Sequence, residues 1–408
     1  MLRLSLIAPL ALVLRCDGGK DTNPKSTDTG ADTAADTAGT DTSETGKDTG
    51  IDTSDTGHDT GDTQPPPPDH GYFGPPTVLI LADDGAGGAN AYTLSGPAGP
   101  ATLIPSLTVS VDSALACAGP FIWVLPRGAD SSAPDHAYGV EAHNGSLGKT
   151  LELPASFVPR AATYVAGSYW FGGDGSASLV SFADDGTAGP SLDLSSVADG
   201  DGLPEVHAFV QTDQGVGAVL AHLQGSTGFG ASGFAILDFA SATVTSSGTF
   251  AGNNAGSVGV SVPGGLLADM SAHGSTLGGI EMMNTTTMAS SGNVVSFSGV
   301  TRVATSQGGN DGTFWTVTSA SGTTTATHYS SDGTSLAAIP THTETGAFAH
   351  LPPNVYSGEG TGASTTIEVY EEAAGTPGGS LALGHTIYKI IACQPPPQAP
   401  DTGDTAGP

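Results

Sequence analysis

The stretch Ser178–Leu194 reads SLVSFADDGTAGPSLDL and contains the unit from which this chain is built. A run in which polar and apolar residues alternate leads to a polar turn at Asp184-Asp185-Gly186. A second run with apolar residues follows the turn. An Asp-Gly or Asn-Gly turn between two such runs is a strong signal of a β-hairpin. Ala137–Leu153, AYGVEAHNGSLGKTLEL, has the same form with Asn-Gly in its turn. The two stretches therefore predict two β-hairpins of one kind.

The hairpin unit recurs along the chain at a regular interval. Besides the two quoted stretches, it occurs at Ala91–Ile104, Gly233–Phe250, Gly279–Phe297, Ala326–Ile339 and Thr366–Leu383. The mean spacing of the turns is about 46 residues, which leaves room for two more strands between successive hairpins. Four strands in a repeat of this length are typical of a β-propeller blade. The pattern predicts an all-β, seven-bladed β-propeller over residues 77–394, and a pair of tandem β-sandwiches is the alternative.

The two ends of the repeat region indicate how the ring closes. The first unit lacks an innermost strand, because Val78–Leu81 leads directly into its hairpin, whereas His385–Ala392 is a spare strand after the seventh hairpin. A closed ring must cover both edges, so we expect the spare strand to become the innermost strand of the first blade. Cys393 then ends that strand, and Cys117 ends the equivalent strand of the second blade. This arrangement predicts a Cys117–Cys393 disulfide, with two free buried thiols as the alternative.

The N-terminus has the form of an export signal. An apolar run of eleven residues, Leu4–Leu14, follows a single arginine and ends just before Cys16. The run is too short to span a bilayer. Residues 1–16 resemble a bacterial lipoprotein signal, which implies that Cys16 is lipidated and anchors the protein in a membrane. Leu14 and Arg15 depart from the small residues of that signal, so secretion with another cleavage site and a misassigned start codon stay open as alternatives.

Residues 17–76 form a low-complexity segment in which Asp-Thr occurs ten times between Asp21 and Thr63. The segment has 13 acidic residues and 3 lysines, and Ile51 is its only large apolar residue before Tyr72, which is too little to form a core. It is expected to be a disordered stalk, with the prolines of residues 65–68 as a stiff spacer, and residues 395–408 are expected to be a disordered tail. The stalk resembles the Asp-Thr-Gly-rich spacers of some bacterial surface lipoproteins, whose domains include divergent β-propellers. The resemblance implies an outer-membrane or cell-surface location, and secretion is the alternative.

Composition excludes some classes of protein. The chain carries a formal net charge of −30, and the predicted propeller has 25 acidic but only five basic residues. Nothing in it can neutralise a row of phosphates, so no nucleic-acid partner is expected. Three cysteines are too few for a disulfide-dense small scaffold. The expected partners are the membrane, through Cys16, and an unidentified surface protein or glycan.

A polar ligand site is predicted at one mouth of the central channel. In a propeller, the loops that enter the innermost strands and the loops between second and third strands share one face. The candidates come from the entry loops. The candidate ligand-binding residues there are Asp112, Arg160, His207, Arg302, His342, Glu344 and His350. Two of the three arginines in the predicted propeller fall in this set. The alternative is that these side chains only line a wet channel mouth.

No cofactor is expected apart from calcium. Asp199, Asp201 and Glu205 occupy positions 1, 3 and 7 of a glycine-containing segment, and oxygen ligands at that spacing suit calcium. The full twelve-residue calcium loop is missing, so a solvated acidic turn is the alternative. The local group His342, Glu344 and His350 lacks the spacing of a transition-metal motif.

No catalytic set converges in the sequence, so the first hypothesis is a non-catalytic binding or scaffolding module at the cell surface. The alternative is a secreted hydrolase or lyase that acts on polysaccharide or peptide through carboxylates at the channel mouth. A structural surface-coat component is a third hypothesis. An enzyme requires titratable groups from different blades that meet in one place with shifted pKa values. Trp123, Trp170 and Trp315 fall on second strands and are expected to pack between blades, with a sugar-binding platform as the alternative.

Overall fold

The computed structural model describes residues 71–395 with the exception of 95, 98, 128–135, 175, 199–201, 222, 224–230, 254, 271–277, 298–300, 309–311, 321–322, 342–346 and 359–364. The predicted signal with Cys16, the stalk up to residue 70 and the tail from residue 396 therefore lie outside the described residues. Within them, the only helical segment is one turn of 3-10 helix, η1 (Ser195–Val197), and no helix is long and apolar enough to cross a membrane.

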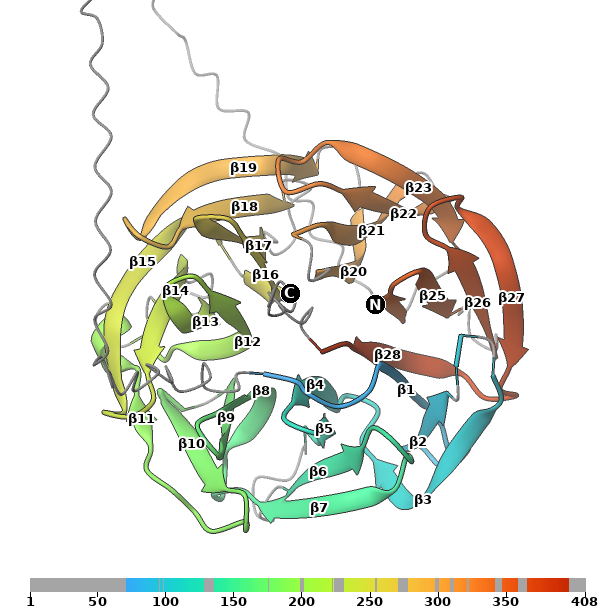
Figure 1. Ribbon diagram of the computed structural model, residues 1–408, viewed down its shortest axis with the longest axis horizontal. Helices are drawn as coiled ribbons and strands as arrows, with labels where there is room; N and C mark the ends of the chain where they lie inside the picture. The colour runs from blue at the N-terminus through green and yellow to red at the C-terminus, as the bar shows by residue number, and fades with distance from the viewer. Residues whose placement is uncertain are drawn as a thin grey trace, which may run out of the picture. The chain divides into compact units, whose positions relative to one another are not determined.

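Seven four-stranded antiparallel sheets form a ring, so the protein is a seven-bladed β-propeller as predicted, not a pair of sandwiches (Figure 1). The innermost strands of blades 1 to 7 are β28 (Ile387–Cys393), β4 (Ala114–Ala118), β8 (Val158–Val165), β12 (Glu205–Thr212), β16 (Ala255–Val262), β20 (Thr301–Gly308) and β24 (Phe348–Leu351). The second strands are β1 (Thr77–Asp83), β5 (Phe121–Leu125), β9 (Ser168–Asp174), β13 (Gly215–Ala221), β17 (Gly265–Met270), β21 (Phe314–Ala320) and β25 (Asn354–Gly358).

The outer two strands of each blade form the hairpins that the repeat predicts. The third strands are β2 (Ala89–Leu94), β6 (His136–Glu141), β10 (Ser178–Ala183), β14 (Ala231–Asp238), β18 (Gly278–Asn284), β22 (Thr323–Tyr329) and β26 (Thr366–Glu371). The outermost strands are β3 (Ala101–Val109), β7 (Leu147–Glu152), β11 (Leu192–Asp193), β15 (Thr243–Asn253), β19 (Ala289–Phe297), β23 (Ser335–Thr341) and β27 (Thr376–Ala382). The turn glycines Gly145 and Gly186 have positive φ values of 68° and 87°, which explains their place in these turns.

The ring closes as the sequence predicts. Strand β28 pairs antiparallel with β1 from Thr77 opposite Cys393 to Ala82 opposite Ile387, so the last strand becomes the innermost strand of blade 1 (Figure 1). The predicted disulfide is present: Cys117 at the end of β4 is bonded to Cys393, 276 residues away in the sequence. The bond joins blades 1 and 2 at the point where the chain completes the ring.

Each pair of neighbouring blades shares one apolar cluster, and the seven clusters together form the core of the described propeller. The three tryptophans belong to these clusters and are almost fully buried, which confirms the packing role expected for them. Trp123 packs edge to face against Phe171 of the next blade, with ring centroids 5.0 Å apart. Apolar side chains therefore hold the blades together.

The two faces of the ring differ in the kind of connection they carry. We call the face on which innermost strands turn into second strands, and third strands into fourth, the hairpin face. The opposite face, on which one blade leads into the next, is the connection face.

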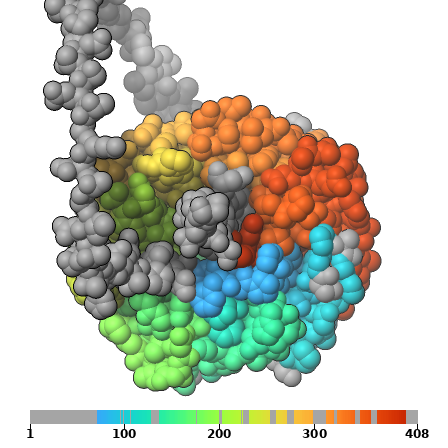
Figure 2. All heavy atoms as spheres, in the orientation of Figure 1, coloured from blue at the N-terminus to red at the C-terminus, as the bar shows by residue number. Residues whose placement is uncertain are grey.

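The folded chain begins on the hairpin face, earlier than expected. Residues 71–73 lie beside the β4–β5 turn: the Phe73 N–H donates to the Gly119 carbonyl at 2.9 Å, and the Gly119 N–H donates to the Gly71 carbonyl at 2.7 Å. Tyr72 is buried in the cluster between blades 1 and 2. The first described residues, in blue, accordingly lie on the surface beside the green blades (Figure 2). The expected boundary between residues 76 and 77 is therefore late, because an aromatic side chain and backbone bonds dock the end of the predicted stalk.

Candidate functional site

Two adjacent innermost strands carry a β-bulge at the same place, near their first residues. The extra residue is Arg160 in β8 and His207 in β12. A bulge redirects the side chain of the extra residue and is common beside functional sites. Here the two bulges bring Arg160 and His207 together: the Arg160 Nη1 atom lies 2.8 Å from His207 Nε2. Two matching β-bulges, one in blade 3 and one in blade 4, therefore form the first part of the site.

Asp174 joins Arg160 to a second arginine from the neighbouring blade. It is the last residue of β9 and lies opposite Val158, at the connection face. Its Oδ2 atom accepts a hydrogen bond of 2.6 Å from Arg160 Nη2 and another from Arg127 Nη2. Arg127 follows β5 in blade 2. One carboxylate oxygen thus binds guanidinium groups from two blades, an arrangement in which each charge offsets the burial of the others.

The hydrogen bonding of this arginine pair is incomplete within the described protein. Three buried atoms have no hydrogen-bond partner among the residues that the structure describes: Arg127 Nε, Arg160 Nε and Asp174 Oδ1. An unpaired buried polar group costs free energy, so such a group in a native protein calls for an explanation. The guanidinium side chains are also accessible, with 33% of Arg127 and 21% of Arg160 exposed. Both observations suit a site that receives a polar ligand.

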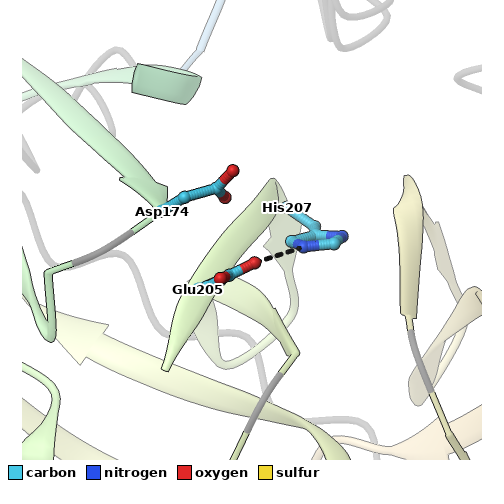
Figure 3. Close-up of side chains that lie close together, drawn as sticks. All are labelled: Asp174, Glu205 and His207. Atoms are coloured by element: carbon cyan, nitrogen blue, oxygen red, sulfur yellow. Dashed lines mark ion pairs between the residues drawn. The ribbon is translucent and has the colours of Figure 1, made fainter. Parts of the chain in front are cut away.

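His207 contacts both an arginine and a glutamate, and Figure 3 shows its ion pair with Glu205 as a dashed line. Its Nε2 atom is 2.8 Å from Arg160 Nη1 and 3.5 Å from Glu205 Oε2. A guanidinium only donates and a carboxylate only accepts, so one ring nitrogen cannot satisfy both. Burial lowers the pKa of His207 most, and the charge of Arg160 lowers it further, against the effect of Glu205. The imidazole is therefore neutral at neutral pH, with Nε2 accepting from Arg160.

Lys389 adds a third cation from blade 1. It lies in β28, and its Nζ atom donates to the backbone carbonyls of Asp112 at 3.0 Å and Ser113 at 2.7 Å. Burial lowers the pKa of Lys389 to about 8, and the charges of Arg127 and Arg160 contribute to the shift. Three of the five basic residues of the propeller thus gather at this end of the axis, in a protein that is otherwise strongly acidic.

One metal-ligating set lies in the same place. Asp174, Glu205 and His207 each offer one ligand atom within 4.8 Å of the others, and their side chains approach one another in Figure 3. A divalent ion there must displace Arg160 from both Asp174 and His207, and Arg127 also binds Asp174. The cations therefore disfavour a metal at this set.

Several predicted residues do lie in this group. Arg160, His207 and Glu205 meet, and Asp112 contacts Lys389 through its carbonyl group. Arg302 lies in β20, where only its backbone is described. Asp199 and Asp201 lie outside the described residues, so the calcium hypothesis stays a prediction. Two of the seven predicted mouth residues, His342 and Glu344, also lie outside them and stay predictions.

His350 is not at the predicted mouth. It is the third residue of the short strand β24, pairs with Val355 beside the β24–β25 turn, and contacts Glu372. That turn lies on the hairpin face, opposite Arg160. The prediction for His350 is wrong because β24 has only four residues, so a position near its start is already close to its end.

Arg127, Asp174 and Lys389 belong to the site but were not predicted from the sequence. The sequence contains a signal for two of these residues, because Arg127 and Asp174 come just after the apolar runs FIWVL and YWFGG of second strands. The chain leaves each second strand at the connection face. Lys389 lies inside the closing strand. Its contribution follows only from the closed ring, because blade 1 must first be placed beside blade 2.

Comparisons with known proteins give the fold alone. No family model matches this chain, and no curated protein matches it. Among solved structures, a protein from Lactobacillus plantarum is 13% identical with a TM-score of 0.54, covering 78% of this chain and 99% of its own. A putative 6-phosphogluconolactonase from Bacteroides fragilis is 11% identical with a TM-score of 0.55, covering 78% and 98%. A periplasmic gluconolactonase from Pseudomonas aeruginosa is 11% identical with a TM-score of 0.51, covering 79% and 99%. At these identities the likeness supports the propeller architecture and leaves the site to be judged by its own residues.

Proposed function

We propose that this protein is an exported β-propeller that binds a small carboxylate-bearing ligand at its connection face. The observation that carries the proposal is the pair of Arg127 and Arg160 on Asp174, with two guanidinium Nε atoms that lack a partner among the described residues. Lys389 adds a third charge, because the charges of both arginines affect its pKa. Guanidinium groups bind carboxylates through two parallel hydrogen bonds, which gives both affinity and orientation. The chain as a whole carries a net charge of −30, so its solubility does not require a cationic group at this place.

The position of the first described residues supports a tethered arrangement. Residues 71–73 lie on the hairpin face, whereas Arg160 and Asp174 lie on the connection face. We infer that the stalk joins the propeller on the side away from the ligand site. If Cys16 is lipidated, as its place after the apolar run implies, the stalk tethers the propeller to a membrane. Mass spectrometry of the mature N-terminus tests the anchor.

Titration calorimetry with a matched pair of sugars tests the binding proposal. We expect D-glucuronate to bind the full chain at least tenfold more tightly than D-glucose, because only the former has a carboxylate. Arg127→Gln and Arg160→Gln should each weaken glucuronate binding by about ten- to a hundredfold, the usual effect of losing a charge-assisted bond. Lys149→Gln removes the same charge elsewhere in blade 2 and should leave binding unchanged. Equal binding of both sugars, or equal effects of all three variants, would contradict the proposal.

Hydrolysis is the second candidate function, and one observation favours it. Titratable groups from four blades meet at this site, and His207 and Lys389 have lowered pKa values. A neutral imidazole can act as a general base toward water, and a guanidinium can stabilise the oxyanion that forms. In the structure, however, Arg160 donates to the His207 Nε2 lone pair, so catalysis requires Arg160 to move first.

A sugar lactone is the first substrate to try, because two proteins of the same fold are named as gluconolactonases. Hydrolysis that disappears in His207→Asn would support the second candidate. If the protein binds its ligand but shows no turnover that is lost in His207→Asn, binding remains the function.

A further inference from the structure

The carboxylate of Asp174 is only half used by the two arginines. Its Oδ2 atom accepts hydrogen bonds from both guanidinium groups, whereas its buried Oδ1 atom accepts none from the residues that the structure describes. An ionised carboxylate only accepts hydrogen bonds, so Oδ1 can be satisfied only by a donor. A ligand that completes the hydrogen bonding here must therefore bring a donor for Asp174 as well as acceptors for the arginines.

The groups that lack partners are close neighbours. Arg160 Nη2 lies 2.6 Å from Asp174 Oδ2, and Oδ1 is bonded to the same carbon atom as Oδ2. The unpartnered Nε atoms of Arg127 and Arg160 belong to the same planar guanidinium groups that contact Asp174. One small ligand can reach both kinds of group only if its donor lies beside its carboxylate. The carbon atom next to the carboxylate is the position that meets this requirement.

The charges at the site decide which donor this is. The two guanidinium groups share the single negative charge of Asp174, which leaves one positive charge for a ligand carboxylate to neutralise. An ammonium group on the same ligand would restore the excess positive charge, and Lys389 lies near enough for both arginines to affect its pKa. A hydroxyl group donates a hydrogen bond without adding charge. The charge balance therefore favours a hydroxyl group over an ammonium group.

We propose that the site selects a 2-hydroxycarboxylate, whose carboxylate binds Arg127 and Arg160 and whose hydroxyl group donates to Asp174. The inference rests on the proposed function and names the class of carboxylate. The side chains are accessible, with 33% of Arg127, 21% of Arg160 and 15% of Asp174 exposed. Although Oδ1 is buried, the carboxylate of an aspartate turns readily about its Cβ–Cγ bond, and this rotation can direct the unpartnered oxygen toward the ligand.

Competition against D-glucuronate, followed by calorimetry on the full chain, tests the inference with glycolate, acetate and glycine. These compounds share one two-carbon frame and carry a hydroxyl group, a hydrogen atom or an ammonium group beside the carboxylate. We expect glycolate to bind about tenfold or more tightly than acetate, the usual effect of a hydrogen bond to a charged group. Glycine should bind more weakly than glycolate by a similar factor.

Asp174→Asn separates a specificity role from a structural one. The variant keeps the size of the side chain but can form only a neutral hydrogen bond with the hydroxyl group, so the preference for glycolate over acetate should fall to about threefold or less. Acetate should bind at least as tightly as before, because a negative charge beside the ligand has been removed. Damage to the site would instead weaken both compounds alike. Asp185→Asn is the matched control: it removes an acidic charge from an exposed turn of the same blade and should leave the preference unchanged.

The outcomes distinguish this inference from the function on which it rests. If D-glucuronate does not bind, the carboxylate site itself is contradicted and the inference fails with it. If D-glucuronate binds but glycolate and acetate compete equally, only the inference is overturned. Tighter binding of glycine than of glycolate, or a full preference for glycolate in a folded Asp174→Asn, overturns it as well. Thermal unfolding checks that each variant is folded.

Discussion

Arg160 is the residue on which the connection-face site depends. It bonds Asp174 through one nitrogen and His207 through another, so it links a carboxylate of its own blade to an imidazole of the next. Arginine suits this position because its fork of donors can serve two acceptors at once, which a lysine cannot reproduce in the same geometry. The hydrogen bonding of His207 Nε2 and the orientation of Asp174 therefore both depend on this side chain.

Lys389 should make ligand binding depend on pH. Its pKa of about 8 means that the ammonium is charged below pH 8 and largely neutral above pH 9. Loss of this charge removes one of three cations, so the affinity for D-glucuronate should fall as the pH rises through 8. Calorimetry between pH 7 and 9 measures the effect. Lys389→Arg keeps its charge over this range and should bind with little change across it.

The lowered pKa of Lys389 also makes the stability of the protein depend on pH, and thermodynamic linkage gives the direction of that dependence. The pKa of Lys389 is lower in the folded protein than its ordinary value of 10.5, so the unfolded chain binds more protons between these values. The contribution of this group to the free energy of unfolding should therefore rise with pH from about 8 to about 10.5.

A glucuronate affinity that stays constant from pH 7 to 9 in the wild type would contradict the role given to Lys389 in ligand binding.

At the level of single residues, the sequence predicted part of the site. Arg160 and His207 could be placed because they lie at the starts of predicted innermost strands. Asp174 and Arg127 were missed because the candidate residues came from the entry loops alone, although the loops after second strands were expected on the same face. No periodicity in the sequence shows that Arg160 and His207 are bulged, since a bulge is a property of the pairing register and not of either strand alone.

Among the structural elements, the contact between β9 and β12 positions the site. Gly172 in β9 faces Val206 in β12, and a Cβ atom at residue 172 would lie 2.4 Å from the Val206 Cβ atom. Because Val206 lies between Glu205 and His207 in the chain, this close approach brings both side chains toward Asp174 at the end of β9. The glycine is required here by the distance between blades and not by its backbone conformation.

Gly172→Ala should therefore separate blades 3 and 4 and loosen the site. The added methyl group overlaps Val206, and overpacking of this kind destabilises proteins by about 1 to 3 kcal/mol. Urea unfolding should show this loss, and glucuronate binding should weaken although no ligand-binding side chain has changed. Gly378→Ala is a matched control, because a Cβ there meets nothing closer than 3.6 Å. Equal stability and binding of the two variants would show that the β9–β12 contact does not position the site.

On the scale of the whole molecule, the architecture was the most predictable feature. Hairpins such as Ala137–Leu153 and Ser178–Leu194 repeat at a spacing that suits four strands, and a ring of such sheets buries one apolar cluster between each pair of neighbours. The spare strand at residues 385–392 has an obvious place because an unpaired edge at the start of the ring must be covered. The position of His350 could not be predicted in the same way, because it depends on the length of one short strand.

The closure of the ring should contribute measurably to its stability. The Cys117–Cys393 bond closes a loop of 276 residues and joins the last strand to blade 2. Removing a disulfide typically lowers the free energy of unfolding by about 2 to 4 kcal/mol, with long loops at the higher end of the entropic expectation. Cys117→Ala/Cys393→Ala should show this loss in urea. Its amide hydrogens should exchange faster in β28 and β1 than in the wild type, while those of β13 and β14, on blade 4, change little. An unchanged unfolding midpoint, or faster exchange spread evenly over all blades, would mean that the pairing of β28 with β1 closes the ring without help from the bond.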